Sequence, residues 1–348
     1  MRVTINDVAR RAGVSVRTVS RVLNNHPNVN RFTRERVLQA IKELNFVPNA
    51  LARGLATQES RTIGVIIPDV ANPYFAEVLR GIEDVASQAN YHIFLCNTDE
   101  DPEREQHSIR LLRQRQVDGL ILVSPRLSNQ TAARIFRDDQ RVVVVNRSWT
   151  HLGITSIVTN NREQGLQAAD FLAASKPTCL AYLSGPVTSE SNELRWLGFS
   201  ERAAELKLEV MRITPSLHRI PTIKRGHEAM DELLASAALP VGVFCFNDLM
   251  AIGALDSIAN HGLRVPEDVS IVGVDGIEMA GRVHPSLTTF VIPKIQVGNT
   301  AMQCLLDMFQ EDSQPEEVVI PAAAVQRSST GKASEFVSSH QRETSIRR

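Results

Sequence analysis

The chain has 348 residues, of which 43% are hydrophobic and 22% are charged, and its formal net charge is -1. This length exceeds one typical core, so we expect two or three domains, and the ordinary composition argues against a disordered or fibrous chain. The first residues contain no apolar signal core and no stretch reaches transmembrane length, which predicts a cytoplasmic protein with no membrane partner.

The charge is divided unequally along the chain. Residues 1–60 contain 10 Lys and Arg against 4 Asp and Glu, whereas the remaining residues contain 28 against 35. A basic head on an acidic body indicates that only the head meets a polyanion. The cysteines are far apart in sequence, which predicts free thiols rather than a zinc site or a disulfide framework, at Cys96, Cys179, Cys245 and Cys304.

Three short helices are expected at the start of the chain. Thr4 is placed to cap the first helix, Gly13 to end it, and Ser15 to cap the second. Two helices joined by Ala-Gly-Val-Ser cross steeply, so the pattern over residues 4–24 is typical of a helix-turn-helix.

The third helix is expected to begin after Thr33, with Phe32 packing onto Val37 and with Leu38 on the inner face. Pro48 would end the helical region. Residues 49–60 are helix-compatible but too short to be stable alone, so they are interpreted as a hinge.

The second helix separates its residues into two arcs when they are placed at 100° steps. Thr18, Val19, Val22 and Leu23 fall on the arc that faces the core, and the opposite arc consists of Val16, Arg17, Ser20 and Arg21. Arginines at the start of such a helix favour contacts in a DNA major groove. A solvated helix face with incidental arginines is the alternative.

From residue 61 onward, short apolar runs alternate with amphipathic helical segments. This alternation predicts parallel, doubly wound sheets, and the number of runs favours two sheets that face each other across a ligand cleft. The predicted strands are residues 62–67, 92–96, 119–123, 142–145, 157–159, 179–183, 241–246, 269–274, 287–292 and 318–320. The polar tail 331–348 is expected to be disordered.

Several segments together resemble the lactose-repressor/galactose-repressor (LacI/GalR) family of bacterial transcription regulators. These are the stretch from TINDVARRAGVSVRTVSRVLN to NALARGLAT, then IGVIIPDVANPYFAEVLRGIE, VDGLILV, RWLGF, FNDLMAIGAL, GLRVPEDVSIVGVDG and HPSLTTFVIP. The resemblance covers about residues 3–325. It implies an all-α helix-turn-helix head and an α/β sensor, similar to periplasmic binding proteins, of two doubly wound parallel-sheet subdomains.

The resemblance implies a DNA-binding role for specific residues of the head and hinge. Val16, Arg17 and Arg21 match base-reading positions, and Ser20 shares their arc. Backbone or peripheral contacts are implied for Ser15, Thr18, Asn24, Asn28 and Asn30. Asn49, Ala52 and Leu55 belong to a hinge helix that folds on DNA, where Leu55 would wedge into the minor groove; a routine apolar hinge residue is the alternative for Leu55.

The resemblance also implies an effector site. The matching residues are Tyr74, Phe75, Arg195, Asn247 and Asp275, and Arg147 and Trp196 are additional candidates. An ordinary surface arginine is the alternative for Arg195, and a turn residue before Gly276 is the alternative for Asp275. Asn160-Asn161 and Pro221 depart from the family pattern, so the effector of a known family member is not transferred to this chain. The expected effector is a sugar or sugar derivative, with a nucleobase or another metabolite as the alternative.

The function expected from these observations is a repressor that binds a palindromic operator as a homodimer under the control of a small molecule. An enzyme is the first alternative, but no dinucleotide, P-loop, zinc-protease or nucleophile-elbow motif occurs, and no cofactor or metal is expected. A small-molecule-binding transport module is the second alternative, and the basic head argues against it. The tail 331–348 contains no leucine, which argues against a tetramer-forming heptad helix.

The predicted domain boundaries follow from these changes in pattern. The DNA-binding domain spans residues 1–48, the hinge 49–60 and the effector-binding domain 61–330. Within the last, subdomain one is expected at about 61–160 plus 291–317, and subdomain two at about 161–290 plus 318–330.

Overall fold

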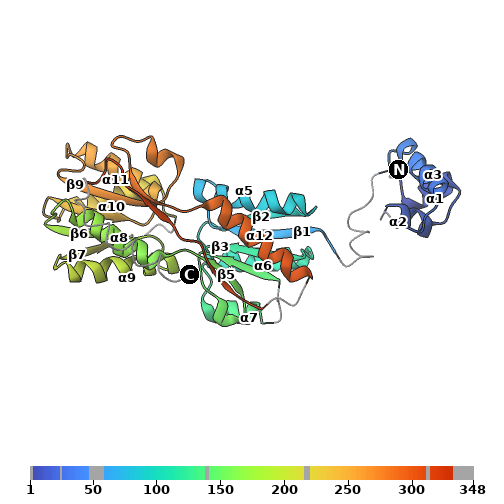
Figure 1. Ribbon diagram of the computed structural model, residues 1–348, viewed down its shortest axis with the longest axis horizontal. Coiled ribbons are helices and arrows are strands. Elements are labelled where there is room, and N and C mark those ends of the chain that lie inside the picture. The colour runs from blue at the N-terminus through green and yellow to red at the C-terminus, as the bar shows by residue number, and fades with distance from the viewer. Residues whose placement is uncertain are drawn as a thin grey trace, which may run out of the picture. The chain divides into compact units, whose positions relative to one another are not determined.

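The computed structural model describes residues 3–23, 26–46, 59–137, 141–214, 220–310 and 314–331 (Figure 1). They belong to two compact units, Met1–Arg61 and Thr62–Arg348. Among these residues, none of the helices combines the length and the apolar character that a membrane span requires.

The first unit contains α1 (Ile5–Ala12), α2 (Val16–Leu23) and α3 (Arg31–Glu43). The hydroxyl of Thr4 donates to Asp7 Oδ2 over 2.7 Å at the start of α1, and this hydrogen bond lowers the pKa of Asp7. Gly13 ends α1 with a φ of 63°, in the left-handed region that glycine tolerates. Ser15 Oγ accepts from the Thr18 amide over 3.1 Å. The predicted start and end of the first helix and the predicted start of the second are therefore confirmed.

The start of α3 differs from the prediction. Asn30, not Thr33, caps the helix, because Asn30 Oδ1 accepts from the Thr33 amide over 2.9 Å. Phe32 then lies in the first turn and is 78% exposed, so its expected packing onto Val37 is wrong. Leu38 is 51% exposed and also does not belong to the inner face.

The core of the first unit explains the position of Leu38. The inward stripe of α3 follows Val37, Ala40, Ile41 and Leu44 at helical spacing, and Leu38 is one residue beyond that stripe. These residues pack against α1 and α2, whose buried members are Val8, Ala9, Ala12, Val19 and Val22.

Two six-stranded sheets form the second unit over the described residues. The first has the order β11-β5-β4-β3-β1-β2 and comprises β1 (Thr62–Ile67), β2 (His92–Asn97), β3 (Gly119–Val123), β4 (Val142–Val145), β5 (Thr155–Val158) and β11 (Glu317–Val319). The second has the order β12-β10-β9-β8-β6-β7 and comprises β6 (Cys179–Leu183), β7 (Val210–Ile213), β8 (Val241–Cys245), β9 (Val269–Asp275), β10 (Thr288–Val291) and β12 (Ala323–Val325). Among the strand pairs of the described residues, only β10–β12 is antiparallel.

These sheets confirm the predicted fold class. All ten predicted strands are present, some shifted by one or two residues, and β7 and β12 were not predicted. Helices cover both sheets (Figure 1). α5 (Pro73–Gln88), α6 (Pro102–Gln114), α7 (Asn129–Ile135) and α12 (Lys294–Gln310) lie with the first sheet, and α8 (Asn161–Ala173), α9 (Glu190–Glu205), α10 (Ile223–Leu234) and α11 (Asp248–Asn260) with the second.

Helices α8 and α9 pack at backbone contact through a pair of glycines. A Cβ atom on Gly165 would lie 2.2 Å from the Arg195 carbonyl oxygen, and one on Gly198 would lie 1.9 Å from the Arg162 carbonyl oxygen. No side chain fits at either position without separating the helices. This contact fixes α9, the helix that carries Arg195.

The chain passes between the two sheets three times, after β5, after β10 and between β11 and β12. Because β11 pairs with β5 through Val318 and Val319, residues 318–319 lie in the first sheet, whereas the sequence prediction assigned 318–330 to subdomain two. We propose that subdomain one extends to about residue 320. The other predicted domain boundaries stay predictions.

Candidate DNA interface and ligand cleft

Helix α2 presents the predicted arc of side chains outward. Val16, Arg17 and Arg21 are exposed and Ser20 is half-buried. Val19 and Val22, on the opposite arc, are buried, and so the helix is anchored by one face only. The exposed face offers two guanidinium groups and one branched apolar side chain.

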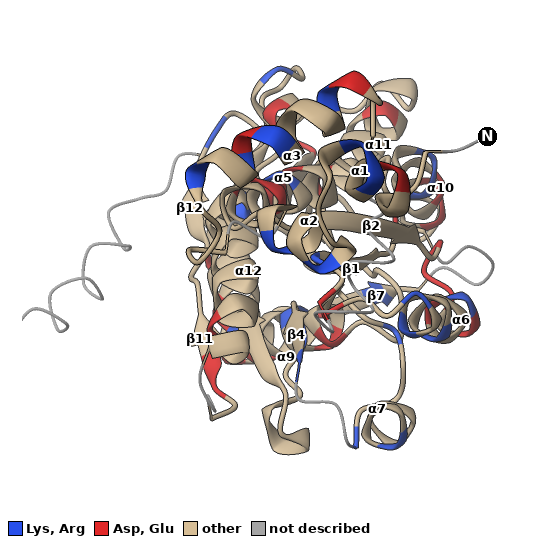
Figure 2. Ribbon diagram, turned by 90° about the vertical axis from the view of Figure 1, so that its right-hand side faces the viewer, with Lys and Arg blue, Asp and Glu red and all other residues tan. Residues whose placement is uncertain are grey.

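The arginines of this face have no carboxylate partner in the described residues. The acidic residues of the three helices pair elsewhere: Asp7 with Arg10, Glu35 with Arg31, and Glu43 with Arg11. Helix α2 itself contains no acidic residue (Figure 2). The positive charges of Arg17 and Arg21 are therefore uncompensated, which suits a polyanionic partner.

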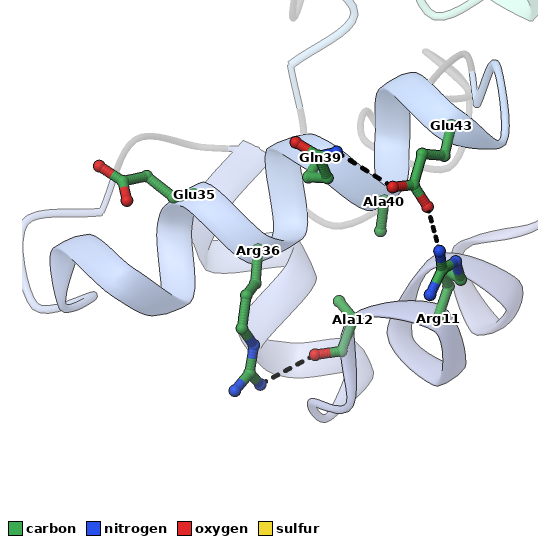
Figure 3. Close-up of a pocket in the computed structure, with 7 residues that line it drawn as sticks. All are labelled: Arg11, Ala12, Glu35, Arg36, Gln39, Ala40 and Glu43. Atoms are coloured by element: carbon green, nitrogen blue, oxygen red, sulfur yellow. Dashed lines mark hydrogen bonds and ion pairs between the residues drawn. The ribbon is translucent and has the colours of Figure 1, made fainter.

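A hollow between α1 and α3 has a different character (Figure 3). Arg36 Nη2 donates to the carbonyl oxygen of Ala12 over 2.8 Å, at the end of α1, where backbone acceptors lack helical partners. Arg11 and Gln39 both contact Glu43, at 2.5 and 3.1 Å. The side chains of Arg36, Arg11 and Gln39 therefore bind groups of the protein itself. These contacts connect α1 with α3 and do not present a recognition surface.

Other residues with a predicted DNA-binding role have local contacts in this unit. The hydroxyls of Ser15 and Thr18 lie 2.9 Å apart at the start of α2, and Asn30 caps α3. Asn28 is exposed. The structure does not describe four of the predicted residues, which are Asn24, Asn49, Ala52 and Leu55.

The second unit contains a cleft lined by side chains that belong to both subdomains. About 30 Å³ of free space remains between these side chains, enough for one or two water molecules. Five predicted effector residues line it together: Tyr74, Phe75, Arg195, Asn247 and Asp275. Prediction had not identified Asn72, Glu100, Ser124, Arg126, Asn146, Ser189, Ser191 and Phe246, whereas Pro221 had been noted only as a departure from the family pattern.

On the side of the cleft next to the first sheet, the polar groups form hydrogen bonds and an ion pair with one another. Asn146 Nδ2 donates to the Tyr74 hydroxyl over 2.8 Å and to Ser124 Oγ over 2.9 Å, and burial raises the pKa of Tyr74. Arg126 forms a buried ion pair with Glu100. The Arg126 amide donates to Glu105 Oε2 over 2.6 Å, while burial raises the pKa of Glu105 to about 7.

On the side of the second sheet, Arg195 and Asn247 are held by backbone and amide groups. Arg195 Nη1 donates to the Phe246 carbonyl oxygen over 2.7 Å, and the guanidinium lies 5.2 Å from the centre of the Phe246 ring. Arg195 is only 5% exposed, so the alternative of a surface arginine is wrong. Asn247 caps α11 by accepting from the Met250 amide over 3.0 Å.

Asp275 ends β9 in an unusual backbone conformation, with a φ of 114°. Lys294 Nζ donates to its carbonyl oxygen over 3.0 Å and holds the turn in place. Burial and the nearby Asp248 carboxylate raise the pKa of Asp275 to about 8. Its side chain lines the cleft and is buried, and it forms no ion pair with the residues that the structure describes.

Arg147 and Trp196, the two additional candidates, are not among the described residues that line the cleft. Arg147 follows β4 and donates to the Thr188 carbonyl oxygen over 3.4 Å, which joins the two subdomains. Next to it, the Ser148 amide donates to Glu190 Oε1 over 2.9 Å. Trp196 stacks on Tyr182 with ring centres 5.9 Å apart.

Some of the residues that prediction missed had a usable signal. Ser124 and Asn146 directly follow β3 and β4, and polar residues after parallel strands gather at the ligand edge of a sheet. Glu100 and Arg126 had none, because two charged residues 26 positions apart give no indication of a mutual contact.

These features define the class of protein: a helix-turn-helix DNA-binding unit joined to a two-sheet ligand-binding unit. Comparison with known families matches residues 4–49 to "Bacterial regulatory proteins, lacI family" and residues 169–330 to "Periplasmic binding protein-like domain". The HTH-type transcriptional repressor PurR of Aliivibrio fischeri is 35% identical over 322 residues, which are 90% of this chain and 94% of the relative.

Two solved structures extend the similarity to the whole architecture. The Lac repressor dimer bound to operator and the anti-inducer ONPF is 28% identical, with a TM-score of 0.84 over 94% of this chain and 99% of that chain. The complex of the transcriptional regulator CelR with cellobiose is 27% identical, with a TM-score of 0.67 over 94% and 100%. The chain belongs to the lacI family of bacterial regulatory proteins, a non-enzymatic family of DNA-binding transcriptional repressors.

Proposed function

We propose that the chain represses transcription by binding a palindromic operator as a homodimer, and that a small molecule in the cleft controls this binding. The observation that carries the proposal is the exposed face of α2, where Arg17 and Arg21 remain free of ion pairs within the described residues. Either guanidinium can bind guanine O6 and N7, and Val16 suits a thymine methyl group.

The experiment that tests operator binding is selection of DNA fragments by the full-length protein, followed by mobility shift at physiological salt. A regulator retains discrete complexes with a near-palindromic sequence, because each helix-turn-helix reads one half-site. Binding that is uniform across fragments and disappears at physiological salt would contradict the proposal, since phosphate contacts alone behave in this way.

A homodimer is supported by an apolar edge on the ligand-binding unit. The strand β2 ends the first sheet, and its Phe94 and Leu95 side chains are exposed together with nearby Val70. Exposed apolar side chains on an open edge strand favour association. Phe94→Asp should yield monomers in light scattering, whereas a stable wild-type tetramer unaffected by deletion of 331–348 would contradict the proposed dimer.

The proposed effector is a sugar or sugar derivative, and a nucleobase is the alternative. The polar residues of the cleft, among them Ser124, Asn146, Ser191 and Asp275, suit a ligand with many hydroxyl groups. The related CelR structure contains cellobiose. A thermal-shift screen of sugars, sugar acids and nucleobases distinguishes these classes.

The proposed coupling between the two sites uses the hinge, residues 49–60. Effector binding would change the relation of the two subdomains and so bias hinge folding on DNA, with a coupling of about 1–3 kcal/mol. Leu55→Ala should weaken operator binding while leaving effector affinity unchanged. If the variant binds the operator as tightly as wild type, the hinge is a passive tether. Because the target is DNA, the cytoplasm is the proposed location.

A further inference from the structure

The cleft contains a buried cation that no carboxylate neutralises. Arg195 donates to two neutral acceptors, the Phe246 carbonyl oxygen at 2.7 Å and Gln164 Oε1 at 3.3 Å. Throughout the described ranges, Arg195 takes part in no ion pair, although it is only 5% exposed. Neutral dipoles offset only part of the free energy that burial of a guanidinium costs.

The other arginine of the cleft is already neutralised. Arg126 and Glu100 form an ion pair in which their side chains are 4% and 1% exposed. This pair therefore adds no net charge to the site. The charge of the cleft depends on Arg195 and on the protonation of Asp275.

Charged groups on several elements face Asp275. They are Asp248 from α11, Arg195 from α9, Lys294 from α12 and Glu77 from α5. Burial raises the pKa of Asp248 to about 7, although Asp248 accepts from Thr289 Oγ1 over 2.6 Å and from the Ile277 amide over 2.9 Å, and these donors favour its ionised form.

The carboxyl group of Asp275 accepts no hydrogen bond from the described residues, and Lys294 is paired with Glu77 at 3.6 Å. Burial and the Asp248 charge keep the pKa of Asp275 above neutrality, so the group is mostly protonated at pH 7. A protonated Asp275 cannot neutralise Arg195, and the cleft is left with one uncompensated positive charge.

We propose that the effector is a monoanionic polyhydroxy compound, a sugar acid, whose carboxylate pairs with Arg195 and accepts a hydrogen bond from Asp275. This inference rests on the proposed role of the cleft as the effector site. A single negative charge matches the single uncompensated cation, and a carboxylate presents two oxygens to a guanidinium. The hydroxyl groups of the ligand would bind Ser124, Asn146 and Ser191 once the two subdomains move apart, because the cleft as described has room for only one or two water molecules.

Matched ligand pairs test the charge of the effector on the full-length protein. Calorimetry compares D-glucuronate with D-glucose, D-galacturonate with D-galactose, and D-gluconate with D-sorbitol; D-ribose 5-phosphate with D-ribose tests phosphate. We expect at least one acid to bind roughly 10- to 100-fold more tightly than its neutral counterpart. Equal or tighter binding of the neutral members, binding of the phosphate alone, or no binding by any acid would overturn the inference.

The direction in which effector affinity changes with pH is an independent test of the inference. If the acid binds only while Asp275 is protonated, its affinity should fall about tenfold between about pH 7 and about pH 9, as the group ionises. A neutral ligand that needs the ionised carboxylate would instead bind more tightly as the pH rises. The opposite sign would therefore overturn the inference.

Substitutions of Arg195 distinguish the effect of its charge on acid binding from the effect of its shape. Arg195→Lys should retain part of the affinity for the acid, whereas Arg195→Gln should lose roughly 100-fold, because only lysine keeps the charge. Asp275→Asn should keep acid binding within about tenfold and abolish the pH dependence. Arg202→Gln, which changes a half-buried arginine on the same helix that pairs with Asp170, is the matched control. Equal losses in Arg195→Lys and Arg195→Gln would contradict the role of charge.

Operator binding separates this inference from the proposed function. If a neutral sugar binds and alters operator affinity, only the sugar-acid inference fails. If no tested ligand, acidic or neutral, changes operator affinity, while Arg195→Gln leaves operator binding unchanged, the proposed sensing role of the cleft fails as well.

Discussion

The two units of the molecule use arginine in opposite surroundings. In the helical unit, Arg17 and Arg21 extend from α2 into solvent, where their charge costs little and acts on a distant polyanion. In the ligand-binding unit, Arg126 and Arg195 are buried, and each has acceptors that the fold supplies. An arginine side chain is therefore free to bind a partner in the helical unit, whereas in the ligand-binding unit its burial depends on the acceptors around it.

The ion pairs of the two units show the same difference. Arg11 and Glu43 lie 2.5 Å apart in the helical unit, with side chains 58% and 36% exposed. Arg126 and Glu100 are in equally close contact, but both are almost completely buried. Water can replace the partner of an exposed charge but not that of a buried one, so similar contacts should differ greatly in the cost of breaking them.

The largest expected effect is that of Glu100→Ala, which removes the ion-pair partner of the buried Arg126 side chain. We expect a loss of about 3–5 kcal/mol in the free energy of unfolding. Urea unfolding followed by fluorescence measures it, because both tryptophans, Trp149 and Trp196, belong to the ligand-binding unit. Glu100→Gln, which keeps an acceptor, is the control. A loss below about 1 kcal/mol would show that water reaches the pair.

Asp275→Ala should abolish the effector response. Removing the side chain deletes a hydrogen bond to a charged group, which costs about 1.5–3 kcal/mol of effector affinity. Operator binding without effector should not change, because Asp275 ends a strand at the cleft rather than lying inside a core. Unchanged effector affinity in calorimetry would remove Asp275 from the site and favour its alternative role as a turn residue.

Arg17→Ala tests the exposed arginines. We expect a loss of about 1–3 kcal/mol that depends on one base pair in each half-site, with relaxed preference at that position. Mobility shift with a set of operator variants measures the effect, and Arg31→Ala, which removes an exposed arginine paired with Glu35, is the control. A loss that is uniform across all variants would identify Arg17 as a phosphate contact.

The smallest expected effect is that of Glu43→Ala. The pair with Arg11 is exposed, so its loss should cost about 0–1 kcal/mol of stability, far less than Glu100→Ala. Thermal unfolding of the full chain followed by circular dichroism measures the change. A cost comparable to that of Glu100→Ala would remove the contrast between the two units.

Sequence patterns predicted the regular elements well where the pattern was strong. Most of the ten predicted strands are rich in valine and isoleucine and all ten form in the structure, whereas the unpredicted β7 and β12 are short edge strands. β12 consists of Ala323, Ala324 and Val325, and alanine gives little strand signal. In the helical unit, the outward arc of α2 followed from helical periodicity, while the cap of α3 did not, because Asn30 and Thr33 are both competent caps.

The residues of the candidate sites can also be divided into those that the sequence indicated and those whose contacts only the structure shows. The sequence by itself determined which residues point outward from α2, because a helix repeats every 3.6 residues whatever it packs against. It also indicated Tyr74, Arg195 and Asp275 as cleft residues, through the family resemblance. Only the tertiary structure decided that Arg195 is buried against Phe246, 51 residues away, and that Glu100 neutralises Arg126, 26 residues away. Burial and partnership arise when separate elements pack together, and local spacing contains no information about which distant groups will meet.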